Sequence, residues 1–118
     1  MPELSSHILD GINGKSASGI RVQLLGLSSV LENKIVFDVV SDEQGRIAES
    51  VEIVDGDSEQ LFEMVVYGHQ YFVDMHQVQN VAQHMKQVVI RFSMVAREQR
   101  YHIPVVLSPH SYTVWWSD

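Results

Sequence analysis

Short runs in which apolar and polar residues alternate recur along this chain of 118 residues and constrain its fold more than any other feature. Successive side chains of a strand point to opposite faces of a sheet, so this alternation predicts strands with one buried face. Arg46 is expected either to open a further strand or to lie at the edge of a loop. Such a series of short strands favours an antiparallel β-sandwich. The alternating runs are residues 20–25, 34–40, 60–67, 88–95, 101–107 and 112–116.

Each run offers one apolar face to the core. Pro104 lies inside the run 101–107. Because proline has no N–H to donate, that strand should lie at an edge or be bulged there. The expected core faces are Ile20-Val22-Leu24, Ile35-Phe37-Val39, Phe62-Met64-Val66 and Val88-Ile90-Phe92-Met94.

The periodicity changes between Val73 and Met85, after an expected turn at Gly68-His69. Apolar residues recur there at spacings of three and four, which predicts one short amphipathic helix. Its apolar positions are Met75, Val78, Ala82 and Met85. We expect the methionines at both ends of this set to pack in the core.

Composition excludes several classes of protein. Eight Lys and Arg against 15 Asp and Glu give a net charge of −7, which disfavours nonspecific nucleic-acid binding. The absence of cysteine removes disulfide scaffolds, thiolate metal sites and cysteine nucleophiles. With 45% apolar residues and no run near the roughly 20 that span a bilayer, we expect one domain over residues 1–118 and no membrane segment. The start of the chain lacks a signal-peptide pattern, so the expected compartment is the cytoplasm.

Six histidines are the remaining candidates for chemistry near neutral pH, at positions 7, 69, 76, 84, 102 and 110. His76 and His84 lie about two helical turns apart, whereas metal pairs more often stand three or four residues apart. We therefore expect both at the surface rather than as a metal pair. His69 and His110 are expected to be loop residues.

Three segments resemble a known family. Ser6-His7-Ile8-Leu9-Asp10 resembles an S-x-H-[VI]-L-D opening, and Ser41-Asp42-Glu43-Gln44-Gly45-Arg46-Ile47 resembles T-[DN]-x-x-G-R-[IL]. Tyr101-His102-Ile103-Pro104-Val105-Val106-Leu107-Ser108-Pro109 resembles Y-H-[VI]-P-L-L-L-S-P. In order and spacing these segments are similar to those of the transthyretin-like family, and more closely to its 5-hydroxyisourate hydrolase branch.

The resemblance implies both a fold and an activity. The fold is an all-β transthyretin-like sandwich of two four-stranded sheets with one short helix. The assembly is a homotetramer, a dimer of dimers with active sites at the dimer–dimer interface. The activity is hydrolysis of 5-hydroxyisourate, a product of urate oxidation in purine catabolism, without metal or cofactor. The family's catalytic residues fall on His7, Arg46 and His102.

These three residue types suit the implied reaction. A neutral histidine can accept a proton from water, and an arginine can hold carbonyl oxygens and developing negative charge. One histidine would act as general base, while the other would orient the substrate or protonate the leaving nitrogen. The sequence does not assign the role of general base to one histidine or the other.

The C-terminal tail departs from the pattern of the branch. Its enzymes end in Tyr-Arg-Gly-Ser, which lines the active site, and this chain ends in Trp115-Trp116-Ser117-Asp118. Trp116 could stack on a planar heterocycle, and Asp118 would add a carboxylate to the substrate site. Alternatively, Trp115 and Trp116 pack across a subunit interface and close the pocket.

Two classes of function therefore remain from the sequence. The first is a cyclic-ureide hydrolase acting on 5-hydroxyisourate or, after divergence, on a related heterocycle. The second is a non-catalytic small-molecule-binding protein on the same scaffold. The simultaneous presence of His7, Arg46 and His102 favours the hydrolase, because a pure binder does not need all three.

Overall fold

The computed structural model describes residues 2–27, 34–53, 59–76, 85–95 and 100–117. Within these residues the chain forms strands and a helix in an order that confirms the expected β-rich fold. The elements are β1 (Glu3–Asp10), β2 (Arg21–Gly26), β3 (Ile35–Val40), β4 (Arg46–Ser50), β5 (Gln60–Tyr67), α1 (His69–His76), β6 (Gln87–Met94), β7 (Arg100–His102), β8 (Val105–Ser108) and β9 (Ser111–Val114).

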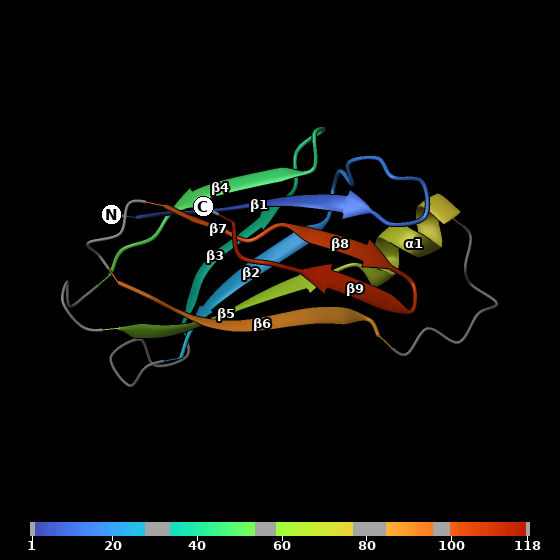
Figure 1. The fold of residues 1–118 in the computed structure, drawn as a ribbon. Helices are drawn as coiled ribbons and strands as arrows, with labels where there is room; N and C mark the ends of the chain where they lie inside the picture. Colours follow the sequence, from blue (N-terminus) through green and yellow to red (C-terminus); the bar gives the residue numbers. More distant parts are fainter. Residues whose placement is uncertain (1, 28–33, 54–58, 77–84, 96–99, 118) are drawn as a thin grey trace.

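The strands form two sheets that face each other (Figure 1). One has the order β4-β1-β8-β9, with β7 also paired to β1, and the other has the order β3-β2-β5-β6. Strands β7 and β8 follow one another along the same edge of β1, so they occupy a single strand position. The sandwich of two four-stranded sheets is thereby confirmed. Both pairings of β1 with β7 and β8 are parallel, and the other pairings are antiparallel.

The predicted strand 101–107 is interrupted at Pro104. The Ile103 N–H donates to the Ser5 carbonyl over 3.0 Å, and the Ile103 carbonyl accepts from the Ser6 hydroxyl over 2.6 Å. The ladder with β1 cannot continue through proline, which lacks the N–H. The expected irregularity is therefore a break between β7 and β8, and it ends β7 at His102.

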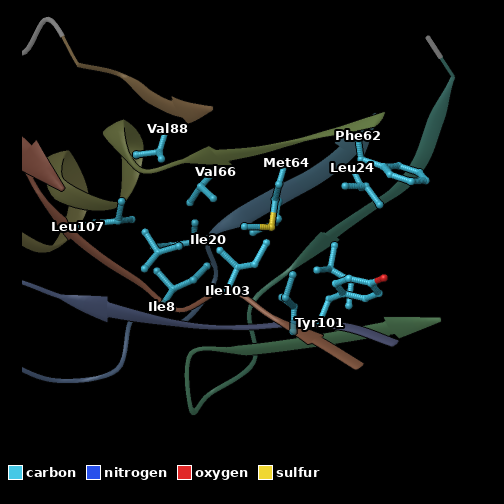
Figure 2. Close-up of a cluster of buried hydrophobic side chains, with 14 of the residues drawn as sticks. Ile8, Ile20, Leu24, Phe62, Met64, Val66, Val88, Tyr101, Ile103 and Leu107 are labelled. Atoms are coloured by element: carbon cyan, nitrogen blue, oxygen red, sulfur yellow. The ribbon is translucent and has the colours of Figure 1, made fainter. Parts of the chain in front are cut away.

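The core lies between the sheets and is lined by the apolar faces read from the alternation (Figure 2). The faces of β2 and β5 are buried as predicted, with Ile20, Leu24, Phe62, Met64 and Val66 at its centre. Ile35 differs, because its side chain is 58% exposed at the start of the edge strand β3. Burial of this contiguous apolar surface is the main stabilising contribution to such a fold.

The helix begins earlier than predicted. It spans His69–His76, so the expected turn at Gly68-His69 is wrong and His69 is its first residue. Its buried residue is Phe72. Gly68 packs so close to Leu107 that an added Cβ would lie 3.1 Å from a Leu107 methyl, which brings the helix against β8. Val78, Ala82 and the rest of residues 77–84 lie outside the described residues.

Two expected core methionines are at the surface. Met75 is 61% exposed and Met85 is 42% exposed, so their predicted packing in the core is wrong. The spacing of three and four selected the wrong face of α1, since the face turned to the sandwich carries Tyr71, Phe72 and His76. Among the described residues, α1 is too short and polar to span a bilayer.

Candidate active site on the outer face of β1

The alternation of β1 decides which side chains leave the core. Leu4, Ser6 and Ile8 are buried, so Ser5 and His7 point to the outer face of the sheet. In the register of the sheet, Ser5 is opposite His102 of β7, and His7 is opposite Arg46 of β4. Two short strands on opposite sides of β1 thus bring the three predicted catalytic residues to one surface.

Arg46 is positioned by the turn between β3 and β4. The Asp42 carboxylate accepts the backbone N–H of Gln44 and of Arg46, each over 2.9 Å. Gly45 closes the turn with a φ of 74°, a conformation that favours glycine. These two backbone hydrogen bonds and the nearby positive charge of Arg46 lower the pKa of the Asp42 carboxyl. The D-x-x-G-R pattern therefore has a structural cause: it forms a tight turn that sends the Arg46 side chain outward.

His102 is held from the side by Ser5. The Ser5 hydroxyl lies 2.7 Å from His102 Nδ1, which leaves Nε2 as the ring nitrogen available to a substrate. Burial lowers the pKa of the His102 imidazole, and the positive charges of Arg46 and His7 lower it further. A histidine with a lowered pKa is neutral at neutral pH and can accept a proton.

His7 has a different partner. Its Nε2 lies 3.1 Å from the hydroxyl of Ser16, in the segment that follows the loop after β1. Ser16 forms an isolated bridge with Leu9, so the contact comes from ordered backbone beside β1. His7 and His102 thus share one face but are held through different ring nitrogens.

A pocket of about 370 Å³ opens on this face. It is large enough for a small heterocyclic molecule, and it holds the side chains of Arg46 and His102 together. His7 borders this pocket on β1 but is not in its lining. Its lining consists of Glu3, Ser5, Ser6, Arg46, Ile47, Ala48, Arg100, His102 and Ser117.

The C-terminal tail reaches the pocket through Ser117. The Ser117 N–H donates to the His102 carbonyl over 2.9 Å, which places the tail beside β7 (Figure 1). Trp116 is 51% exposed and meets the Tyr101 ring edge-on, with ring centroids 5.3 Å apart. The strand predicted over residues 112–116 ends at Val114: the Trp115 N–H still donates to the Pro104 carbonyl, but proline has no N–H to continue the ladder. Asp118 lies outside the described residues.

A second polar cluster, which includes His76, lies on the inner side of β1. The fully buried Asp10 carboxylate accepts hydrogen bonds from Tyr71 Oη over 2.8 Å and from the N–H groups of Ile12 and Asn13, and it pairs with His76 Nε2 over 2.5 Å. His76 is only 18% exposed, so its predicted surface position is wrong. No pattern in the sequence indicates that α1 turns this histidine toward Asp10. Burial and the bond to Asp10 raise the pKa of Tyr71 to about 12.

Two histidine predictions remain, and the structure tests one of them. His110 lies exposed at the turn between β8 and β9, as predicted for a loop residue. His84 lies outside the described residues. Sequence reasoning placed Ser117 in the tail expected near the site, but it did not name Ser5, Ser16 or Arg100 as neighbours. Ser5 could have been found, since it stands two residues before His7 on the same face of a strand. Ser16 carries no such signal.

Comparison with known proteins identifies the family. The model of the HIUase/Transthyretin family matches residues 4–116, nearly the whole chain. The chain belongs to this family. Within it, the 5-hydroxyisourate hydrolase of Pseudomonas aeruginosa is 23% identical over 115 residues, which cover 98% of this chain and 90% of that protein.

Solved structures of the family share the fold. The structure of Klebsiella pneumoniae 5-hydroxyisourate hydrolase matches with a TM-score of 0.76 and 22% identity, and each chain is covered completely. A crystal structure of (S)-allantoin synthase matches with a TM-score of 0.81 and 23% identity. That match covers 98% of this chain and 43% of the synthase chain, so this chain spans less than half of the synthase.

Proposed function

We propose that this protein hydrolyses 5-hydroxyisourate, opening the ring of a cyclic ureide in purine catabolism. Two findings support the proposal. The family includes relatives of nearly equal length that carry the name 5-hydroxyisourate hydrolase. Independently, the outer face of β1 carries two histidines and an arginine from three separate strands, beside a pocket of suitable size. The single observation that carries the proposal is the convergence of Arg46 and His102 in that pocket.

His102 is the better candidate for the general base. Its lowered pKa keeps the ring neutral, and the Ser5 contact at Nδ1 leaves Nε2 to take the proton of an attacking water. The oxygen of that water bonds to the ring carbonyl carbon while the C–N bond of the ring breaks. Arg46 binds the carbonyl oxygen, on which negative charge develops.

His7 completes the site from the neighbouring position on β1. It lies opposite Arg46, and it would orient the substrate or return a proton to the nitrogen that leaves the carbonyl carbon. The chemistry of these three side chains needs neither metal nor cofactor. Trp116 and Asp118 remain proposed substrate contacts.

The assembly and location follow the family expectation. We propose one transthyretin-like domain over residues 1–118, a homotetramer built as a dimer of dimers, and a cytoplasmic protein. The half-exposed rings of Trp115 and Trp116 support association, because exposed aromatic surface at the end of a sheet is costly on a monomer. The mass of the assembly in solution, measured by light scattering, distinguishes the tetramer from smaller forms.

The test is the decay of freshly generated 5-hydroxyisourate, followed by its ultraviolet absorbance. The protein should accelerate this decay over buffer and over heat-denatured protein. If the folded oligomer leaves the rate at that of buffer, 5-hydroxyisourate is not the substrate. Binding of the stable precursor urate, measured by calorimetry, would then separate a binding protein from a hydrolase with another substrate.

A further inference from the structure

The contact between His7 and Ser16 joins a proposed catalytic residue to a segment without an assigned role. Ser16 Oγ lies 3.1 Å from His7 Nε2, and both side chains are half-buried. A histidine that works in acid–base chemistry presents one ring nitrogen to the substrate, and the partner of the other nitrogen sets its tautomer and orientation. The partner of His7 therefore decides which of its ring nitrogens is available to give or take a proton.

The backbone around Ser16 is fixed on both sides. The Asp10 N–H donates to the Lys15 carbonyl over 2.8 Å, and the Ala17 N–H donates to the Ile8 carbonyl over 2.9 Å. These bonds flank Ser16 and continue the pairing along this edge of β1 beyond Arg46, where β4 starts. The backbone that carries the hydroxyl is therefore fixed by main-chain hydrogen bonds, which lowers the entropic cost of its bond to His7.

The buried cluster anchors the loop that precedes Ser16. The Asp10 carboxylate accepts the N–H groups of Ile12 and Asn13 at the start of this loop, over 2.8 and 3.2 Å. The same carboxylate is fixed from the other side by Tyr71 and His76 of α1. The helix on the inner side of β1 thus contributes to the placement of a hydroxyl on its outer side.

Ser16 approaches His7 from the side opposite to His102. Gly45, next to Arg46 at the start of β4, packs against this segment, and an added Cβ there would lie 3.1 Å from Ser16 Cβ. His102 lies on β7, across β1 from β4. The bond to Ser16 thus holds the His7 ring on the β4 side of β1, which agrees with its position at the border of the pocket.

We propose that Ser16 is a positioning residue for His7: its hydroxyl occupies Nε2 and leaves Nδ1 as the nitrogen that faces the reaction. The inference rests on the proposed function, since it assigns a role within the same site. It makes the two histidines complementary, because Ser5 occupies Nδ1 of His102 and leaves Nε2 there. The two rings are then locked through opposite nitrogens and are not interchangeable as acid and base.

The first test is spectroscopic and needs no substrate. Imidazole nitrogen chemical shifts report the tautomer of each histidine, and they are compared in the wild type, Ser16→Ala, Ser16→Thr and Ser18→Ala. Ser18 is an exposed serine two residues away and serves as the matched control. Ser16→Ala should move the His7 nitrogen shifts and leave those of His102 in place. Ser16→Thr, which keeps the hydroxyl, and Ser18→Ala should leave both unchanged.

The second test is kinetic. Ser16→Ala should lower kcat about fivefold, the size of one neutral hydrogen bond, with KM within about twofold. Ser16→Thr should restore kcat. A purely structural role would lower the thermal midpoint without moving the His7 nitrogen shifts, and this result would overturn the proposal. Unchanged His7 shifts in a folded Ser16→Ala protein would overturn it as well.

The two tests separate this inference from the proposed function. If the wild type does not hydrolyse 5-hydroxyisourate, the function fails, while the nitrogen shifts still decide whether Ser16 fixes the His7 ring. If the wild type is active and Ser16→Ala retains full kcat with unchanged shifts, the function stands and the role of Ser16 is refuted.

Discussion

The two faces of β1 carry two polar clusters of opposite character, each containing at least one histidine. On the inner face, Asp10 is fully buried, and its carboxylate is surrounded by four donors, including His76 and Tyr71. On the outer face, His7 and His102 each contact one serine and stand beside an exposed arginine and a pocket. Alternation along one strand separates the two clusters by only three residues, from His7 to Asp10.

The two clusters differ in how completely their hydrogen-bonding groups are paired within the protein. In the inner cluster, donors of the protein itself pair with the Asp10 carboxylate. A buried charge needs such partners, because leaving it unpaired costs free energy. The outer cluster leaves one nitrogen of each histidine for a molecule from outside. We infer that the inner cluster stabilises the fold and that the outer cluster performs the chemistry. Each prediction below tests whether the inner cluster acts on stability and the outer cluster on catalysis.

The largest effect is expected at His102. His102→Ala should lower kcat/KM for 5-hydroxyisourate by about 10²- to 10⁴-fold, the usual contribution of a general base. Its free energy of unfolding should stay close to that of the wild type, because the side chain lies at the outer surface. The control is His110→Ala, which removes an exposed histidine at the β8–β9 turn. Full activity in His102→Ala would exclude this histidine from the mechanism.

The next effect is expected at Asp10 and on stability. Asp10→Ala leaves His76, Tyr71 and two backbone N–H groups without their buried acceptor, and it should lower the free energy of unfolding by about 3 kcal/mol. Urea denaturation followed by tryptophan fluorescence measures the change. Asp10→Asn, which keeps one acceptor oxygen, should cost less. A loss below about 1 kcal/mol for the alanine variant would contradict the structural role of the inner cluster.

A smaller effect is expected from Arg46→Lys. Lysine keeps the positive charge but loses the planar donor fork, so kcat/KM should fall about tenfold through the loss of one charge-assisted hydrogen bond. The backbone N–H of this residue still donates to Asp42, so the turn should remain intact. Steady-state kinetics with the thermal midpoint as control checks this prediction, and equal activity would indicate that only the charge matters.

The smallest effect concerns the pH dependence of stability. Burial raises the pKa of Asp10, but the hydrogen bonds from His76, Tyr71 and two backbone N–H groups outweigh it, and the net result is a lowered pKa. The unfolded chain therefore binds more protons near the ordinary value of 3.8, so stability falls as pH drops from that value through the lowered pKa. The urea midpoint should decrease over this range in the wild type and decrease less in Asp10→Asn. Parallel decreases would show that other carboxylates dominate.

The outer cluster was more predictable from sequence than the inner one. His7, Arg46 and His102 stand in three segments that resemble family motifs, and period-two alternation places each on a defined face of its strand. The inner cluster depends on α1, whose boundaries were misjudged because the spacing of Met75 and Met85 suggested an apolar face. The burial of Phe72 and the attraction of the Asp10 carboxylate decide the actual face of the helix. Such contacts between distant segments leave no periodicity in the sequence.

In the C-terminal tail, the alternation of apolar and polar residues predicts the end of the strand incorrectly. The alternation in residues 112–116 predicted a strand to Trp116, yet β9 ends at Val114. The break at Pro104 ends β7, and proline has no N–H to continue the β8–β9 ladder past the bond from the Trp115 N–H to the Pro104 carbonyl. The bond from the Ser117 N–H to the His102 carbonyl accompanies the position of Ser117, rather than a tryptophan, in the lining of the pocket.

The division between the two clusters is tested most directly by the pH profile of kcat/KM for 5-hydroxyisourate, measured between about pH 5 and pH 8. The lowered pKa of His102 means that the ring loses its proton below the ordinary histidine value of 6.5. Activity should rise with pH through that lowered pKa and reach a plateau near neutral pH, and its midpoint should coincide with the His102 titration followed by NMR. A profile that is flat over this range, or that falls where His102 becomes neutral, would contradict the assignment of the outer cluster to catalysis.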